Sequence, residues 1–277
     1  MKIDKVIMSC NDNPFYSDYW PAVSRVWKEK FDIEPVLVYV GSDASRMSTE
    51  YGTVVQQEKL EDVPEHTQAQ WARYWYTQFE PDTMWLLSDI DMLPLSTDYF
   101  VRSLEHIPRE IDPVIHFNTN ATFDVASNKW NLEGDCIQGG VCMPTCYSAA
   151  TGRMRKKILD LVPSFAESIE KLKWQENDYH HAPDGENGVQ HWYAEEAYQS
   201  VKMKDFIREN PHRFFSIGRL GGFCGNRLDR GHSGMPEWNP EWLKAGVYMD
   251  FHMPRPWSDF GDRIQEVVDC YLEGVAV

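Results

Sequence analysis

Two aspartates, Asp89 and Asp91, directly follow a short apolar run at residues 84–88. Carboxylates two residues apart at the end of a buried strand can converge on one hard divalent cation through their oxygen atoms. Such a cation can bind a diphosphate and neutralise the charge that develops on it as a leaving group. Acidic residues also end many strands as ordinary solvent-facing side chains. The pair therefore indicates a cation site only together with the residues and elements around it.

A second group with possible chemistry lies near the end of the sequence, at residues 250–255. His252 follows an apolar stretch that begins at Gly246, and an imidazole is a suitable ligand for Mn²⁺ beside carboxylate oxygens. The guanidinium of Arg255 could form paired hydrogen bonds with a phosphate. An ordinary surface histidine beside a proline-rich turn explains the same pattern, and His232 is a competing candidate.

The elements that must position these residues alternate between strands and helices. Apolar runs predict strands at residues 5–9, 36–40, 53–57 and 84–88, and aromatic stripes at helical spacing predict helices at 16–31 and 66–79. This order predicts an α/β fold with a mainly parallel sheet and helices on both faces. Ligands of such sheets bind beyond the carboxyl ends of the strands. Polar residues stand at those ends here: Asn11 and Asp12, Asp43, and Asp89 and Asp91.

The second half of the chain is less regular. We expect strands at 114–118, 140–143 and 246–252, and helices at 154–162, 165–174, 192–203 and 258–272. Residues 218–234 contain six glycines and are expected to form a loop. No repeat or linker divides the chain, so a single domain over residues 1–277 is expected.

The composition excludes several classes of protein. The 27 Lys and Arg against 43 Asp and Glu give a net charge of −16, which disfavours binding to nucleic-acid phosphates. The longest apolar stretch, at residues 35–40, is far shorter than the ~20 residues of a membrane span, and the charged N-terminus is not typical of a signal peptide. We therefore expect a cytoplasmic protein, with its six cysteines as reduced thiols.

Taken in order, three features resemble the GT-A glycosyltransferases, with small viral and bacterial sugar transferases nearest. They are a first strand that ends in a polar turn, an aromatic helix that carries Gln68, Gln70 and Arg73, and the Asp89-Ile-Asp91 motif. The resemblance covers most of residues 1–145 in layout, although its specific motif is short. It implies a nucleotide-binding half at residues 1–120 and an acceptor-binding half at 121–277.

The resemblance also implies roles for individual residues. Asp91 would bind Mn²⁺ or Mg²⁺ directly with His252, while Asp89 would complete the metal site or reach the ribose. Residues expected to bind the nucleotide-sugar donor are Asn11, Asp12, Asp43, Arg73, Arg255 and the pair Gly139 and Gly140. The two glycines match a small-residue strand that lets the donor sugar approach the backbone, although a bulge explains them equally well.

Residues 191–196 resemble the Trp-x-x-Glu-Asp segment of several inverting GT-A enzymes. Inverting transfer needs a carboxylate that removes the proton from the attacking acceptor hydroxyl. The position that matches this base is Glu196, and the neighbouring Glu195 would bind an acceptor hydroxyl. The sequence departs from the pattern by having Glu in place of Asp. Acidic residues that merely stabilise a helix N-terminus are the alternative.

These features predict a metal-dependent transfer of a sugar from a nucleotide-sugar, UDP-linked by preference, to a carbohydrate hydroxyl, with inversion favoured. Two alternatives remain open. A non-catalytic carbohydrate-binding protein would explain the 11 tryptophans without a metal. A sugar-phosphate nucleotidyltransferase would have a glycine-rich, basic loop after the first strand, and residues 11–15 are neither glycine-rich nor basic.

Overall fold

The computed structural model of the chain describes residues 1–117, 123–124, 129–130, 143, 145–172, 194–218, 227–231 and 234–274. Its centre is a seven-stranded sheet with the strand order β10-β6-β9-β4-β1-β2-β3. These strands are β1 (Lys5–Asn11), β2 (Glu34–Val40), β3 (Thr53–Gln57), β4 (Met84–Ser88), β6 (Val114–Phe117), β9 (Tyr147–Thr151) and β10 (Phe214–Ile217). Only β9 runs antiparallel to its neighbours in this sheet. The expected mainly parallel sheet is confirmed.

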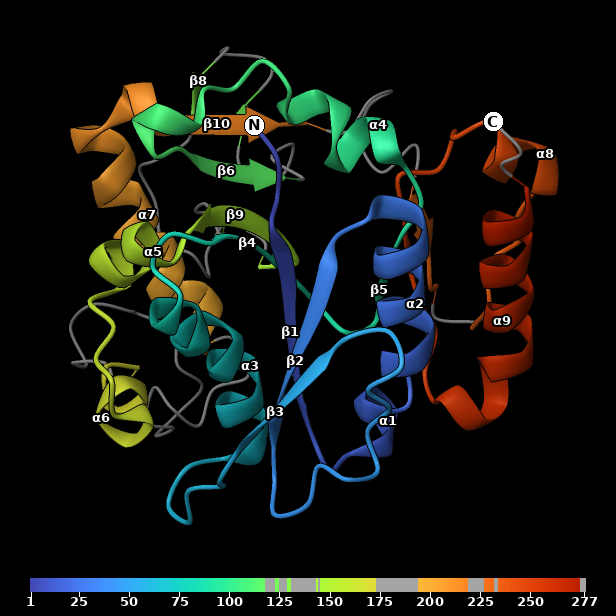
Figure 1. Ribbon diagram of the computed structural model, residues 1–277, viewed down its shortest axis with the longest axis horizontal. Coiled ribbons are helices and arrows are strands. Elements are labelled where there is room, and N and C mark those ends of the chain that lie inside the picture. Colours follow the sequence, from blue (N-terminus) through green and yellow to red (C-terminus); the bar gives the residue numbers. More distant parts are fainter. Residues whose placement is uncertain are drawn as a thin grey trace.

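Helices cover both faces of the sheet, as expected (Figure 1). The helices α2, α4 and α9 share one core with one face, and α3, α5, α6 and α7 share a second core with the other. The helices are α1 (Pro14–Ser17), α2 (Trp20–Phe31), α3 (Glu65–Tyr76), α4 (Thr97–Phe100), α5 (Gly152–Leu159), α6 (Phe165–Glu170), α7 (Ala194–Glu209), α8 (Pro240–Lys244) and α9 (Trp257–Glu273). In the part of the chain that the structure describes, none of them has the length and apolar character needed to cross a bilayer.

Aromatic side chains at helical spacing form much of both cores. Trp27 of α2 is fully buried and meets Phe100 edge-to-face, with 5.3 Å between the ring centroids. On the opposite face, Trp71 of α3 stacks on Tyr74 at 5.4 Å. Such pairs contribute roughly 0.5–1.5 kcal/mol each beyond the burial of their area. The tryptophan stripe of the second predicted helix is therefore core.

The boundaries of some elements differ from the prediction. The segment expected as one helix at residues 16–31 forms two, because Pro21 lies in the first turn of α2 and has no N–H to continue an earlier helix. The helix expected at 66–79 ends at Tyr76 and continues as a 3₁₀ turn. Shorter elements are η1 (Thr77–Phe79), η2 (Arg102–Leu104), η3 (Arg109–Ile111), η6 (Pro211–Arg213), β7 (Phe123–Asp124) and β8 (Lys129–Trp130).

A second, three-stranded sheet has the order β11-β12-β5, with strands β5 (Met92–Pro94), β11 (Arg227–Asp229) and β12 (Asp250–His252). The glycine-rich stretch expected to be a loop thus contains a strand, β11. His252 pairs with Met92 on one side and with Asp229 on the other. Because β5 begins directly after Asp91, this small sheet brings two distant segments, β11 and β12, to the end of β4.

We expect a buried ion pair to hold the small sheet together. Arg227 donates from Nε and Nη2 to the two carboxylate oxygens of Asp250, at 2.8 and 2.6 Å, and the Asp250 side chain is fully buried. Arg227→Gln leaves that carboxylate without its cation, so the free energy of unfolding should fall by about 3–5 kcal/mol in denaturant titrations. Arg102→Gln removes an exposed pair with Asp98 and should cost at most about 1 kcal/mol. Equal losses in the two variants would contradict this role.

Candidate active site

A cavity of about 640 Å³ opens at the carboxyl ends of β1 and β4. These strands are parallel neighbours, so the segments that follow them meet at one edge of the sheet. The N-terminus of α7 and the small sheet also contribute lining residues. The lining residues used below are Asn11, Phe15, Tyr16, Arg73, Asp89, Asp91, Glu195, Glu196, Arg230, His252 and Arg255.

Asp91 is a buried acidic residue of this cavity, with only 6% of its surface exposed. Its Oδ2 atom accepts a hydrogen bond from Nη1 of Arg230 at 2.7 Å, and Nε of Arg255 lies 3.9 Å away. Burial by itself raises the pKa of the Asp91 carboxyl, but His252, Arg230 and Arg255 together hold it well below its usual range. Asp91 is therefore an anion at neutral pH.

His252 faces the same oxygen atom. Its Nε2 lies 3.6 Å from Oδ2 of Asp91, and its Nδ1 lies 3.0 Å from Oδ1 of Asp229. A carboxylate on one ring nitrogen of a histidine orients the other nitrogen toward a metal in many metal sites. Two ligand atoms 3.6 Å apart are also close enough to share one cation at ordinary coordination distances. Asp91 and His252 thus fit a divalent cation.

Asp89 is placed differently from Asp91. Its carboxylate forms an ion pair with Arg73 of α3, which also donates to the carbonyl oxygen of Ser88 at 2.9 Å. Burial by itself lowers the pKa of Arg73, but the nearby Asp89 more than offsets this. Among the described residues, no cluster of three or more His, Cys, Asp or Glu side chains could hold a metal ion. A cation bound by Asp91 and His252 would therefore need further oxygen atoms from water or substrate.

Arg255 lies over the ring of Tyr16, with 4.9 Å between its guanidinium carbon and the ring centroid, and it donates a hydrogen bond to the Tyr16 hydroxyl. Both side chains line the cavity. The guanidinium is therefore held beside Asp91 while it keeps donors for a further anion. This position suits the role in phosphate binding that the sequence predicts for Arg255.

Glu195 and Glu196 lie in the first turn of α7 and both line the cavity. Glu195 is 3% exposed, and its Oε2 has no hydrogen-bond partner in the described structure. Burial raises the pKa of Glu195 to about 7, although the charge of Arg73 opposes this shift. Glu196 is only partly buried. The structure thus places the two carboxyl groups that the sequence singles out beside one another and in different environments.

The other residues predicted to bind the donor differ in whether they line the cavity. Asn11 lines the cavity and donates to Glu65 at 3.4 Å. Asp12 and Asp43 are exposed and lie outside the cavity lining, where Asp12 accepts from the Tyr39 hydroxyl. Their contact with a nucleotide stays a prediction. Gly139 and Gly140 lie outside the described residues, as does the competing candidate His232.

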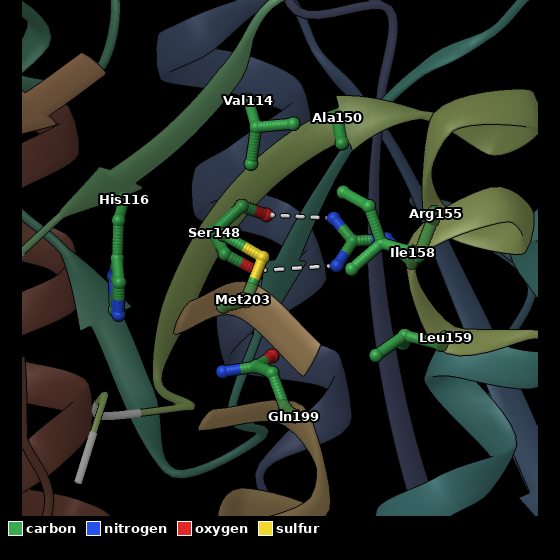
Figure 2. Close-up of a pocket in the computed structure, with 9 residues that line it drawn as sticks. All are labelled: Val114, His116, Ser148, Ala150, Arg155, Ile158, Leu159, Gln199 and Met203. Carbon is green, nitrogen blue, oxygen red and sulfur yellow. Dashed lines mark hydrogen bonds between the residues drawn. The ribbon is translucent and has the colours of Figure 1, made fainter. Parts of the chain in front are cut away.

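A second, much smaller cavity of about 10 Å³ lies between β6, β9, α5 and α7. Figure 2 shows the guanidinium of Arg155 directed at Ser148, to whose Oγ and carbonyl oxygen it donates at 3.3 and 3.2 Å. Burial lowers the pKa of the neighbouring His116 to about 4, so its ring is neutral. A space of this size holds about one water molecule. Of these two cavities in the described part of the chain, the larger one has room for a sugar or nucleotide.

The site also contains three residues that the sequence does not assign to it individually: Tyr16, Asp229 and Arg230. Arg230 belongs to an arginine-rich stretch at residues 208–230 of this acidic chain, and Tyr16 belongs to a predicted amphipathic helix. For that stretch the sequence leaves open contacts with donor phosphates, with an anionic acceptor or with surface carboxylates. Asp229 and Arg230 reach the site because β11 pairs with β12. Pairing between three-residue strands leaves no periodic pattern, so the sequence does not predict that these two residues meet Asp91 and His252.

In sequence, no protein-family model and no curated protein matches the chain. Solved structures similar to it include the bifunctional glycosyltransferase WbbM, at 12% identity and a TM-score of 0.46 over 96% of this chain and 50% of WbbM. The chain thus spans about half the length of WbbM. A glycosyltransferase involved in glycosylation of the major capsid of PBCV-1 is similar at 11% identity and a TM-score of 0.46, over 95% of this chain and 99% of that one. The galactosyltransferase LgtC, solved with donor and acceptor sugar analogues, is similar at 11% identity and a TM-score of 0.45, over 96% of this chain and 95% of LgtC. Similarity at this level assigns no activity to the chain.

Proposed function

We propose that the protein is a glycosyltransferase that moves a sugar from a nucleotide-sugar, UDP-linked by preference, to a carbohydrate hydroxyl with the help of Mn²⁺ or Mg²⁺. The observation that carries this proposal is the make-up of the cavity. Asp91, the oriented His252 and two arginines line the same cavity as Glu195 and Glu196. Side chains suited to a cation and a phosphate therefore share with two carboxyl groups one space large enough for a nucleotide-sugar.

The donor end of the cavity suits a diphosphate. Asp91 and His252 would hold the cation, which when bound stabilises the charge of the departing nucleoside diphosphate. Arg255, held against Tyr16, is placed to donate to phosphate oxygens. The exposed Phe15 at the same end offers a flat apolar surface to a nucleobase.

The α7 end of the cavity suits an acceptor. A hydroxyl that attacks the anomeric carbon must lose its proton, and a positioned carboxylate can accept it. Glu196 is our first candidate for this base, which implies inversion at the anomeric carbon. Glu195, which is buried and has an unpartnered oxygen, would bind an acceptor hydroxyl.

The proposal is tested by incubating the protein with a panel of nucleotide-sugars and Mn²⁺ and measuring release of the nucleoside diphosphate, with and without EDTA. We expect cation-dependent release from a UDP-sugar. A carbohydrate-binding protein without catalysis would release none under either condition. A nucleotidyltransferase would instead consume a nucleoside triphosphate with a sugar phosphate and release pyrophosphate.

Removal of the carboxylate behind His252 should weaken the cation site specifically. Asp229→Ala deletes the partner of the Nδ1 atom of His252, so Nε2 is no longer oriented toward Asp91. Loss of such an orienting group typically reduces metal affinity about 10–100-fold. Calorimetry should therefore show weaker UDP binding in Mn²⁺ and unchanged binding in EDTA. An equal loss under both conditions would mean that Asp229 serves the nucleotide pocket and not the cation.

A further inference from the structure

The two arginines beside Asp91 are held in different ways. Arg255 is anchored by Tyr16 and keeps its Nε atom 3.9 Å from the carboxylate. Arg230 binds the carboxylate directly, at 2.7 Å, and its same Nη1 atom donates to the carbonyl oxygen of Met253 at 3.1 Å. Arg230 is therefore the main counter-ion of Asp91 in the free protein.

A divalent cation would have to share that oxygen. Oδ2 of Asp91 is the atom nearest to Arg230 and also the atom that His252 faces. A cation bound there would lie within a few ångströms of the Arg230 guanidinium, in a buried place where like charges repel strongly. The cation alone must therefore displace the Arg230 guanidinium from its hydrogen bond with Asp91.

A diphosphate removes this conflict. Its oxygen atoms can ligate the cation and also accept hydrogen bonds from a guanidinium, so Arg230 gains a new anion when it leaves Asp91. The positive charge of Arg230 then favours the bound nucleotide instead of opposing the bound cation. This exchange needs only the side chain of Arg230 to move, because the backbone of its neighbour Asp229 is paired within the small sheet.

We propose that Arg230 is a diphosphate-binding residue that makes the cation and the nucleoside diphosphate bind cooperatively. In the free protein it neutralises Asp91 and keeps the affinity for a lone divalent cation low, and with both ligands present it binds a phosphate. The proposal rests on the proposed function, since it assumes a diphosphate in this cavity. Coupling between two ligands is reciprocal, so each must raise the affinity for the other by the same factor.

The experiment measures Mn²⁺ binding by electron paramagnetic resonance with and without saturating UDP, in wild type and in Arg230→Gln. In wild type we expect UDP to tighten Mn²⁺ binding at least about tenfold. In Arg230→Gln, Mn²⁺ alone should bind several-fold more tightly than in wild type, and the enhancement by UDP should shrink. Arg230→Lys keeps the charge and should retain most of the coupling. Arg102→Gln removes an exposed arginine away from the cavity and should behave as wild type.

The outcomes separate this inference from the function on which it rests. If Arg230→Gln and wild type bind Mn²⁺ equally and show the same enhancement by UDP, the coupling role is wrong while the nucleotide site stands. If wild type binds UDP with no dependence on Mn²⁺, both the coupling and the cation site are wrong. If no variant binds UDP under any condition, the proposed function fails as well. Circular dichroism and thermal unfolding of each variant verify that it is folded.

Discussion

Asp91→Asn is expected to abolish the Mn²⁺-dependent part of UDP binding, while the protein remains folded. The amide keeps the size of the side chain but removes the negative charge that attracts the cation, and a hard cation depends strongly on anionic oxygen ligands. Asp91 is also the anion nearest to Arg230 and Arg255. Its loss therefore leaves two cations facing each other without their shared partner.

Isothermal titration of Mn²⁺ and UDP, together and separately, checks this expectation. Binding of UDP in EDTA should persist or increase slightly in Asp91→Asn, because both arginines become free to bind phosphate. Asp98→Asn changes an exposed aspartate outside the cavity lining, so it is the matched control and should titrate as wild type. If Asp91→Asn binds Mn²⁺ and UDP together as well as wild type does, Asp91 is not a metal ligand.

Much of the first half of the fold could be predicted because its elements carry strong local patterns. The four strands expected in the first 95 residues are β1 to β4, and the rule that parallel strands end at one edge placed Asn11 and Asp91 in one cavity. The rule says nothing about side-chain direction. Asp43, which follows β2 at the same edge, is exposed and lies outside the cavity lining.

The rest of the fold depends on contacts between distant segments. Strand β9, with the sequence Tyr-Ser-Ala-Ala-Thr, has neither alternation nor β-branched bulk along most of its length, yet it lies between β4 and β6 and is fully buried. The three strands of the small sheet have three residues each, and only β12 lies within an expected strand, at residues 246–252. Segments such as β5, β9 and β11 become strands through their neighbours, and the local sequence contains no signal for them.

Glu196→Gln is expected to have the largest effect on turnover. The glutamine keeps the size and the hydrogen-bonding capacity of the side chain but cannot accept the proton of the acceptor hydroxyl. A positioned general base contributes about 10²–10⁴-fold, so sugar transfer should fall by that factor while UDP affinity stays unchanged. Initial rates of transfer and calorimetric UDP binding, measured on the same preparation, check both halves of the expectation.

Glu195→Gln is the matched variant at the neighbouring residue, and its effect on stability should depend on pH. The pKa of Glu195 is raised to about 7, so this group is largely protonated below neutral pH. A raised pKa means that the buried neutral acid favours the folded state at low pH, and that this contribution is lost as pH rises through about 7. The stability difference between wild type and Glu195→Gln should therefore change across that range.

The pH dependence of transfer then identifies the base. If Glu196 removes the proton, Glu195→Gln should change the acceptor KM more than kcat. The dependence of kcat on pH near pH 7 should then be the same in wild type and in Glu195→Gln. If Glu195 is the base, kcat should rise through about pH 7 in wild type, and Glu195→Gln should lose both the rise and the activity. Two results would reassign Glu196 to sugar binding: retained anomeric configuration in the product, or near-wild-type turnover in Glu196→Gln. Neither result is compatible with Glu196 acting as the base of an inverting transfer.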